Sequence, residues 1–320
     1  MVNIWQSLKK PIYILAPMED VTDTVFRRIV MQTGKPDLFF TEFTSVEGMF
    51  SKGDKKVNQR LQFTQKEKPI IAQIWGLKPE NYFKAGKLLA EMGFDGIDIN
   101  MGCPEKNIIK KGACSGLIHN PSLAKEIIHA TKEAAGNLPV SVKTRIGFKE
   151  IQTEKWIGFL LEQNLAALTI HGRTAAEMSA VPAHWDEIGK AVEIRNEKKL
   201  PTLIIGNGDV QSIQEAKEKV HQYNLDGIMI GRGIFHNIWL FDETVDPTKK
   251  ILDERLKILV HHVELFEKTW GKTKSFQILK KFFKIYLSGF EGAQELRIRF
   301  METKNGEEVK NLAKTFANSV

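Results

Sequence analysis

The stretch GIDINMGC (residues 96–103) shows the pattern that decides the fold. A short β-branched run ends in polar residues and a turn, and segments of helical periodicity follow. Amphipathic stretches such as ENYFKAGKLLAEMG lie between such runs and are long enough for right-handed crossovers. Eight strand-like runs predict a closed (β/α)8 TIM barrel, an α/β fold. The other seven read IYILAP (12–17), LFFTEF (38–43), PIIAQIW (69–75), VSVKTRI (140–146), ALTIHG (167–172), TLIIGN (202–207) and GIMIGR (227–232).

An open doubly wound sheet would show the same alternation of strands and helices. It ranks second because no GxGxxG motif opens a helix after the first strand. After Phe241 the polar segment DETVDPTKK interrupts the pattern, and from Ile251 onward every periodic segment looks helical. We therefore predict a barrel domain over residues 1–242 and a small C-terminal helical bundle domain over residues 250–320.

The composition narrows the class of protein. The chain has 320 residues, is 42% hydrophobic and has a formal net charge of +7, which suits a polyanionic partner. The last 70 residues hold 13 Lys and Arg against 9 Asp and Glu, so the basic surplus is concentrated there. Only two cysteines occur, which favours the reducing cytoplasm. We expect no signal peptide and no membrane span, because no long apolar run occurs.

Polar residues end most of the eight strand-like runs. In a (β/α)8 barrel the reactive groups lie at the carboxyl ends of the strands, so these residues are candidates for a site. The alternative is that they pair with one another in the barrel mouth, because buried polar groups need partners. The candidates in chain order are Met18, Glu19, Glu42, Gln73, Asn100, Cys103, Lys143, Arg145, His171, Asn207, Gly208, Gly231 and Arg232.

A phosphorylated cofactor with a ring would use these groups. The glycine-containing segments 206–208 and 231–233 follow the last two strands, where barrels often bind phosphate through backbone N–H groups, although tight turns would also explain them. Lys143 and His171 suit an anionic reduced isoalloxazine, and Gln73 and Asn100 suit its neutral edges. This shape predicts flavin mononucleotide (FMN).

Cys103 lies in the turn NMGCPEKN, directly after the fourth strand. A turn there can direct the thiol into the barrel mouth, where a protonated cysteine is a plausible proton donor. The alternative is a small buried apolar residue. We interpret Cys114 as structural. A zinc site from Cys103, Cys114 and His119 is disfavoured because their spacing is unlike that of metal ligands, and we expect no metal.

The chain resembles the tRNA-dihydrouridine synthase family from the first strand through the helical tail. The motifs that carry the resemblance are APMEDVTD (16–23), TEF (41–43), AQIWG (72–76), DINMGCPEKNIIKKGAC (98–114), VKTRIG (142–147), HGRT (171–174), GNGD (206–209) and GRG (231–233). The run NMGCP, followed by a lysine-rich stretch and GA, is the most discriminating of them.

The resemblance implies an FMN-binding barrel that takes hydride from NADPH, or alternatively NADH, and passes it from flavin N5 to C6 of a uridine in the D-loop of tRNA. Cys103 is the matching general acid, which protonates C5. Asn100 faces the uracil, and we assign both Asn100 and Arg145 to substrate binding. The residues matched to FMN binding are Pro17, Met18, Gln73, Lys143, His171, Asn207, Gly208, Gly231 and Arg232.

The tail is the expected site of RNA contact. A uridine in folded tRNA must be unstacked to reach a flavin, which requires contacts around it. In SFQILKKFFKIYLSG (275–289), Lys280, Lys281 and Lys284 fall on neighbouring helical positions, although an ordinary solvated face would look the same. We expect a monomer that binds one tRNA. The rival functions are another FMN-barrel oxidoreductase acting on a small molecule and a non-catalytic RNA-binding protein on the same scaffold.

Overall fold

The computed structural model describes residues 3–317 in two compact units. One unit comprises residues 3–24 and 36–231, and the other comprises residues 25–35 and 232–317. Within the described part of the chain, no helix combines the length and the apolarity needed to cross a membrane.

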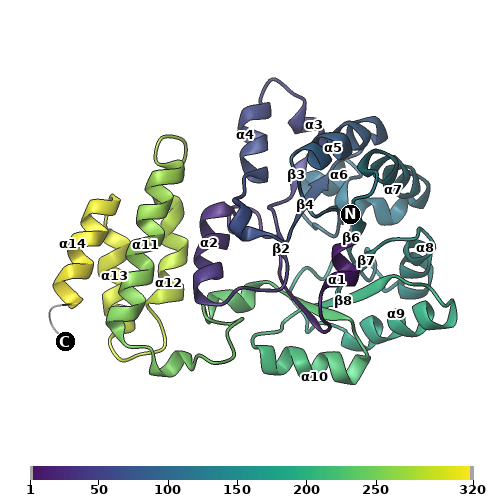
Figure 1. Cartoon of the computed structure of the whole chain (residues 1–320). Helices are drawn as coiled ribbons and strands as arrows, with labels where there is room; N and C mark the ends of the chain where they lie inside the picture. The colour runs from purple at the N-terminus through teal and green to yellow at the C-terminus, as the bar shows by residue number, and fades with distance from the viewer. Residues whose placement is uncertain (1–2, 318–320) are drawn as a thin grey trace. The chain divides into compact units, whose positions relative to one another are not determined.

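The first unit is a barrel of parallel strands (Figure 1). The strands pair in the order β1-β9-β8-β7-β6-β5-β4-β2, and a parallel bridge between Ile14 and Leu38 joins the two ends of this series. The sheet therefore closes, and the predicted (β/α)8 class is confirmed. The strands are β1 (Ile12–Leu15), β2 (Phe39–Phe40), β3 (Thr44–Ser45), β4 (Ile70–Trp75), β5 (Gly96–Met101), β6 (Val140–Arg145), β7 (Ala167–His171), β8 (Leu203–Asn207) and β9 (Gly227–Ile230).

The second predicted strand, residues 38–43, is interrupted in the structure. Its place is taken by β2 and β3, which both pair with β4. Between them the hydroxyl of Thr41 accepts the backbone N–H of Gln73 at 3.0 Å. A side chain thus replaces a backbone carbonyl as the acceptor, and the regular ladder stops there.

Helices lie outside the strands in the barrel unit (Figure 1). Local sequence sets several of their ends: α7 begins with a proline after Asn120, whose side chain accepts the N–H of Leu123, and α10 ends at Asn224 in the left-handed conformation. The helices are α1 (Ile4–Ser7), α3 (Val46–Met49), α4 (Asp54–Asn58), α5 (Pro79–Glu91), α6 (Lys106–Lys110), α7 (Pro121–Ala135), α8 (Gly158–Leu161), α9 (Trp185–Glu197) and α10 (Ile213–Tyr223).

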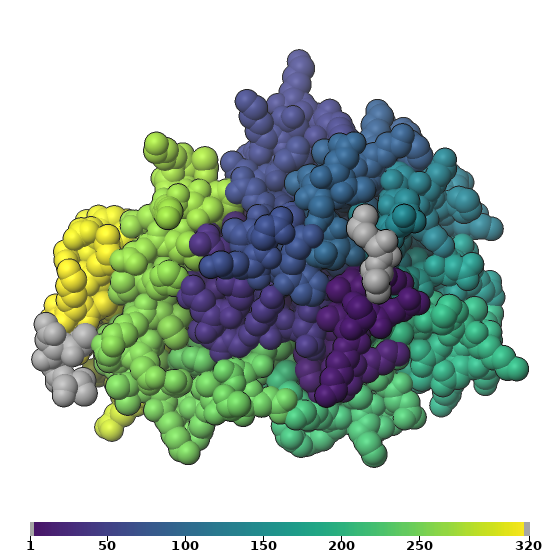
Figure 2. All heavy atoms as spheres, in the orientation of Figure 1, coloured from purple at the N-terminus to yellow at the C-terminus, as the bar shows by residue number. Residues whose placement is uncertain are grey.

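Apolar side chains fill the amino-terminal part of the barrel. Trp5 of α1 is fully buried in one cluster with Ile12, Ala167 and Leu203, which begin or nearly begin their strands. In Figure 2 this N-terminal segment, in dark purple, lies between blue and green parts of the barrel unit. Apolar residues thus occupy this end of the barrel interior, whereas the buried polar side chains of Gln73, Asn100 and Asn207 lie nearer the carboxyl ends of their strands.

The second unit is helical. It includes most of α2 (Thr24–Thr33), although this helix lies between β1 and β2 in the sequence. Phe26 of α2 stacks on Phe282, with ring centroids 5.0 Å apart, and α11 packs against α14. Its other elements are the short 3-10 turns η5 (Arg232–Phe235) and η6 (Pro247–Lys249), followed by α11 (Leu252–Trp270), η7 (Phe276–Phe282), α12 (Phe283–Tyr286), α13 (Ala293–Glu302) and α14 (Gly306–Ala317).

The lysine-rich segment of the tail differs from the predicted α-helix. Residues 276–282 form the 3-10 helix η7, which has about three residues per turn, so the spacing argument for the lysines does not apply there. Lys281 and Lys284 are exposed, whereas Lys280 donates from Nζ to the carbonyl oxygen of Met301 at 2.7 Å. The assignment of RNA binding to residues 250–320 stays a prediction.

Candidate active site at the carboxyl ends of the strands

The strand register places several predicted site residues side by side. Asn100 on β5 pairs with Lys143 on β6, and His171 on β7 lies in register between Arg145 and Asn207. Residues paired in register point to the same face of a sheet, as do residues two apart on one strand. Gln73 therefore points into the barrel with Ile71, and Asn207 does so with Ile205. The structure therefore gathers these polar groups at the carboxyl ends of β4–β8.

Two amides hold the turn that carries Cys103. Asn100 donates from Nδ2 to Oε1 of Gln73 at 3.0 Å. Its Oδ1 accepts the backbone N–H of Gly102 at 3.0 Å and that of Cys103 at 2.9 Å. Asn100, predicted to face the substrate, thus also fixes the backbone on both sides of the peptide bond before Cys103.

The two cysteines of the chain are neighbours in space. Cys103 is half-buried and Cys114 is buried, and neither forms a disulfide. A hydrogen bond from the side chain of Cys114 lowers the pKa of Cys103 to about 7, although burial opposes this shift. Burial raises the pKa of Cys114 well above its ordinary value, so Cys114 remains the thiol that donates.

Sequence reasoning did not find this contact, because Cys114 follows no strand and was interpreted as structural. Cys114 begins the 3-10 helix η3 (Cys114–His119) in a left-handed conformation, with φ of 52°. The next residue, Ser115, donates from Oγ to the carbonyl oxygen of Cys103 at 2.9 Å. The hint that the sequence offers for this contact is that both cysteines lie in the segment that connects β5 to α7.

Lys143 presents a half-buried cation beside Asn207. Its Nζ donates to Oδ1 of Asn207 at 3.1 Å, and Asn207 donates from Nδ2 to the carbonyl oxygen of Met229 at 2.7 Å. Burial, and secondarily the charge of Arg145, lower the pKa of Lys143 to about 8. The ammonium is still the major form at neutral pH, and the amide of Asn207 that accepts its hydrogen bond is neutral.

The glycines predicted to bind phosphate lie beside other predicted residues. A side chain at Gly208 would begin 2.7 Å from Cβ of Ala183, and the His171 ring lies next to the same position. Because Gly208 also has φ of 140°, only glycine suits it. Gly231 lies beside Sδ of Met18, so the ends of β9 and β1 meet there.

The remaining predicted residues follow β1, β2 and β9. Pro17 is buried after β1. Glu19 pairs with Arg60 at 2.8 Å, and Glu42 accepts the N–H of Asp20 at 2.6 Å through Oε1. Arg232 begins η5 in the helical unit.

Arg145, assigned to the substrate, joins two loops of the barrel unit. It donates to the carbonyl oxygens of Gly102 at 2.8 Å, Thr174 at 2.9 Å and Met178 at 3.0 Å. Burial lowers its pKa to about 10, so the guanidinium stays charged at neutral pH. Arg145 therefore ties the turn before Cys103 to the segment after β7, and its role toward a substrate stays a prediction.

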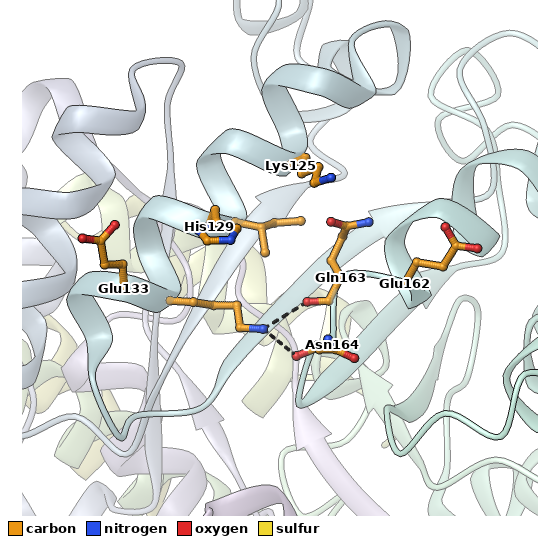
Figure 3. Close-up of a pocket in the computed structure, with 8 residues that line it drawn as sticks. Lys125, His129, Glu133, Glu162, Gln163 and Asn164 are labelled. Atoms are coloured by element: carbon orange, nitrogen blue, oxygen red, sulfur yellow. Dashed lines mark hydrogen bonds between the residues drawn. The ribbon is translucent and has the colours of Figure 1, made fainter.

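A separate hollow of about 680 Å³ lies outside the strands, between α7 and the end of α8 (Figure 3). Lys132 donates there to the backbone carbonyl oxygens of Gln163 at 3.1 Å and Asn164 at 3.0 Å. Both carbonyls belong to the loop after α8, so these bonds tie that loop to α7. Among residues 3–317, no cluster of His, Cys, Asp or Glu is arranged to hold a metal ion.

With this geometry known, comparison with other proteins identifies the family. The family model for dihydrouridine synthases matches residues 14–320. The chain belongs to the dihydrouridine synthase family. The resemblance seen in the motifs is thereby confirmed.

Individual relatives agree with this family. A Bacillus subtilis (strain 168) protein named "Probable tRNA-dihydrouridine synthase 2" is 46% identical over 317 residues, which cover 98% of this chain and 96% of that protein. A Staphylococcus epidermidis protein named "Probable tRNA-dihydrouridine synthase" is 47% identical over 317 residues, with 98% and 96% covered. Members of the dihydrouridine synthase family thus match the chain over nearly its whole length.

The fold has relatives outside this family. A solved structure of morphinone reductase aligns with a TM-score of 0.53 over 74% of this chain and 86% of that chain. The sequences are only 13% identical, so the likeness shows the shared barrel fold alone.

Proposed function

We propose that the protein is a tRNA-dihydrouridine synthase that uses FMN and NADPH, with NADH as the alternative reductant, to reduce the C5–C6 double bond of a D-loop uridine. Membership of the dihydrouridine synthase family and the names of its relatives support this proposal. The observation that carries it is the half-buried thiol of Cys103, which the amides of Asn100 and Gln73 hold within the electrostatic reach of the Lys143 ammonium.

The residues at the strand ends fit a bound flavin. The Lys143 ammonium is partly desolvated and donates to a neutral amide, so an anionic ring beside it would offset the cost of its desolvation. Gln73, Asn100 and Asn207 supply donors and acceptors, and His171 and Gly208 lie together at the ends of β7 and β8. We assign FMN to these residues and to Pro17, Met18, Gly231 and Arg232. The flavin would supply hydride to C6 of the uridine.

Cys103 would donate the proton to C5. A general acid works best when its pKa lies near the working pH, and the pKa of about 7 meets that condition. Because the thiol is the donating form, the proposed step requires pH near or below this value. Asn100 holds the backbone N–H of Cys103 at 2.9 Å, which limits the positions that the sulfur can take.

The helical unit would bind the RNA. Lys281 and Lys284 are exposed there, and Arg297 and Arg299 add charge on α13, although Arg297 also donates to the carbonyl oxygen of Leu287 at 3.1 Å. Cations on a surface bind phosphates through release of counterions. We place the protein in the cytoplasm and expect one monomer to bind one tRNA.

The test is an absorbance titration of the purified protein under nitrogen. Flavin bands should bleach on addition of NADPH and return only when unmodified tRNA is added, with dihydrouridine detected in the RNA. In Cys103→Ala the bleaching should persist and dihydrouridine should nearly disappear. Return of the bands with an enone or another small acceptor, but not with tRNA, would favour another FMN-barrel oxidoreductase. A protein that binds RNA but no added FMN would favour the non-catalytic alternative.

A further inference from the structure

Asp98 is a buried carboxylate that the proposed reaction does not use. It lies on β5 between Gln73 and Ser141 in the strand register and is fully buried. Burial raises its pKa to about 6, while hydrogen bonds from Ser141 and Gln73 and the charge of Lys143 oppose the rise. The carboxylate is therefore the main form at neutral pH, although burial of a charge is costly.

Both oxygens of Asp98 accept hydrogen bonds from side chains. Oδ1 accepts the Ser141 hydroxyl at 2.6 Å, and Oδ2 accepts Nε2 of Gln73 at 2.8 Å. Gln73 then has only Oε1 to offer to Asn100, which donates to it from Nδ2. Asn100 in turn has only Oδ1 to offer to the N–H groups of Gly102 and Cys103.

This series has one direction because it begins at a carboxylate that only accepts and ends at two backbone N–H groups that only donate. An ionised carboxylate has no donor, whereas each amide can present either its oxygen or its NH2 group. With Asp98 at the start, every amide must present its NH2 group toward Asp98 and its oxygen toward Cys103. A reversed amide at Asn100 would direct NH2 at two backbone donors, and the turn would lose both bonds.

We propose that Asp98 is a positioning residue that, through Gln73 and Asn100, sets the direction of this hydrogen-bond series and thereby holds Cys103 in place. The proposal rests on the proposed function only in so far as Cys103 is the proton donor there. The same direction decides which amide donors and acceptors of Gln73 and Asn100 are left to bind a ligand.

The acceptor at position 98, rather than its charge, is the property that sets the direction. In Asp98→Asn the new amide can present its oxygen to Gln73 and its NH2 group to the Ser141 hydroxyl, which also accepts. In Ser141→Ala the carboxylate still accepts from Gln73. In the double variant position 141 offers no acceptor for that NH2 group, which stays unpaired in the interior unless the amide turns it toward Gln73. The direction of the series is then no longer held at its start.

The test is a double-mutant cycle read by alkylation of Cys103. Iodoacetamide reacts with the thiolate, so its rate against pH gives the titration midpoint of Cys103, with peptide mapping to separate it from buried Cys114. The midpoint should stay near pH 7 in the wild type and both single variants. In the double variant the turn loosens, the contact with Cys114 weakens, and the midpoint should rise toward about 8.5. All the changes are near-isosteric, and circular dichroism at each pH checks that the barrel is folded.

Uridine reduction gives the second readout. The rate with reduced enzyme should fall at least about tenfold more in the double variant than the product of the two single effects predicts. The proposal would be overturned if the shift of the Cys103 midpoint in the double variant were only the sum of the two single-variant shifts. It would also be overturned if Asp98→Asn alone gave the full shift. If the midpoints behave as expected and no variant, including the wild type, reduces uridine, the positioning role stands and the proposed function fails.

Discussion

The contact between the two cysteines leads to a prediction about pH. Cys114→Ala removes the hydrogen bond that most lowers the pKa of Cys103, so this pKa should rise from about 7 toward the ordinary value near 8.5. Cys114→Ser keeps a donor at the same place and is the matched control. Alanine and serine tolerate the left-handed backbone at this position no worse than cysteine does.

The magnitude follows from the fraction of Cys103 that carries the proton. With a pKa of about 7, the thiol fraction falls about tenfold between pH 6 and pH 8. With a pKa near 8.5 the same fraction falls only about 1.3-fold. We compare the ratio of the rates at pH 6 and pH 8 within each protein. A less acidic Cys103 thiol slows proton transfer equally at both pH values, so this effect cancels in the ratio.

The assay is single-turnover mixing of reduced enzyme with unmodified tRNA, followed by flavin absorbance. The wild type and Cys114→Ser should lose about tenfold in rate from pH 6 to pH 8, and Cys114→Ala should lose less than about twofold. Lys143 and Asp98 titrate in or near this window but are identical in all three proteins. A tenfold fall in the rate of Cys114→Ala between pH 6 and pH 8 would refute the reasoning, because the pH dependence would then come from a group other than Cys103.

Three further predictions concern charged residues. The Lys143 ammonium loses its proton as pH rises through about 8, so FMN affinity should weaken by up to about tenfold per pH unit above that, and Lys143→Met should bind weakly with no such dependence in a fluorescence titration. Arg145→Ala leaves three carbonyl oxygens without their donor and should lower the free energy of unfolding by about 2–4 kcal/mol in urea; a loss below about 1 kcal/mol would contradict this. Lys281→Ala and Lys284→Ala should each reduce the slope of log K against log salt for tRNA by about one, whereas Lys84→Ala, at an exposed site on α5, should leave it unchanged.

Much of the barrel could be predicted because its information is local. The runs at 96–101 and 167–172 alternate or are continuously apolar over the length of a strand, and β5 and β7 begin at the predicted residues. The helical pattern predicted from Ile251 onward begins with α11 (Leu252–Trp270). The interruption between β2 and β3 could not be predicted, because it depends on a bond from Gln73 to Thr41, 32 residues away.

Local patterns also misplaced parts of the helical unit. Helical periodicity over 275–290 suggested one α-helix, but the structure forms η7 and then α12, where buried Phe282 and Phe283 both contact other aromatic rings. Residues 25–35 have the amphipathic pattern of a barrel helix and yet belong to the helical unit. An amphipathic pattern shows that a face is buried and does not show against what.

The residues of the candidate site also fall into those that the sequence could locate and those that only the tertiary structure could. Sequence alone determined that Gln73, Asn100, Lys143, His171 and Asn207 stand at or near strand ends, because the period of two and the turn that follows each run are properties of neighbouring residues. Only the tertiary structure decided that Asp98 directs the Gln73 amide and that Cys114 reaches Cys103. Those contacts join different strands and loops, and barrel closure both creates them and excludes the water that would otherwise replace each partner.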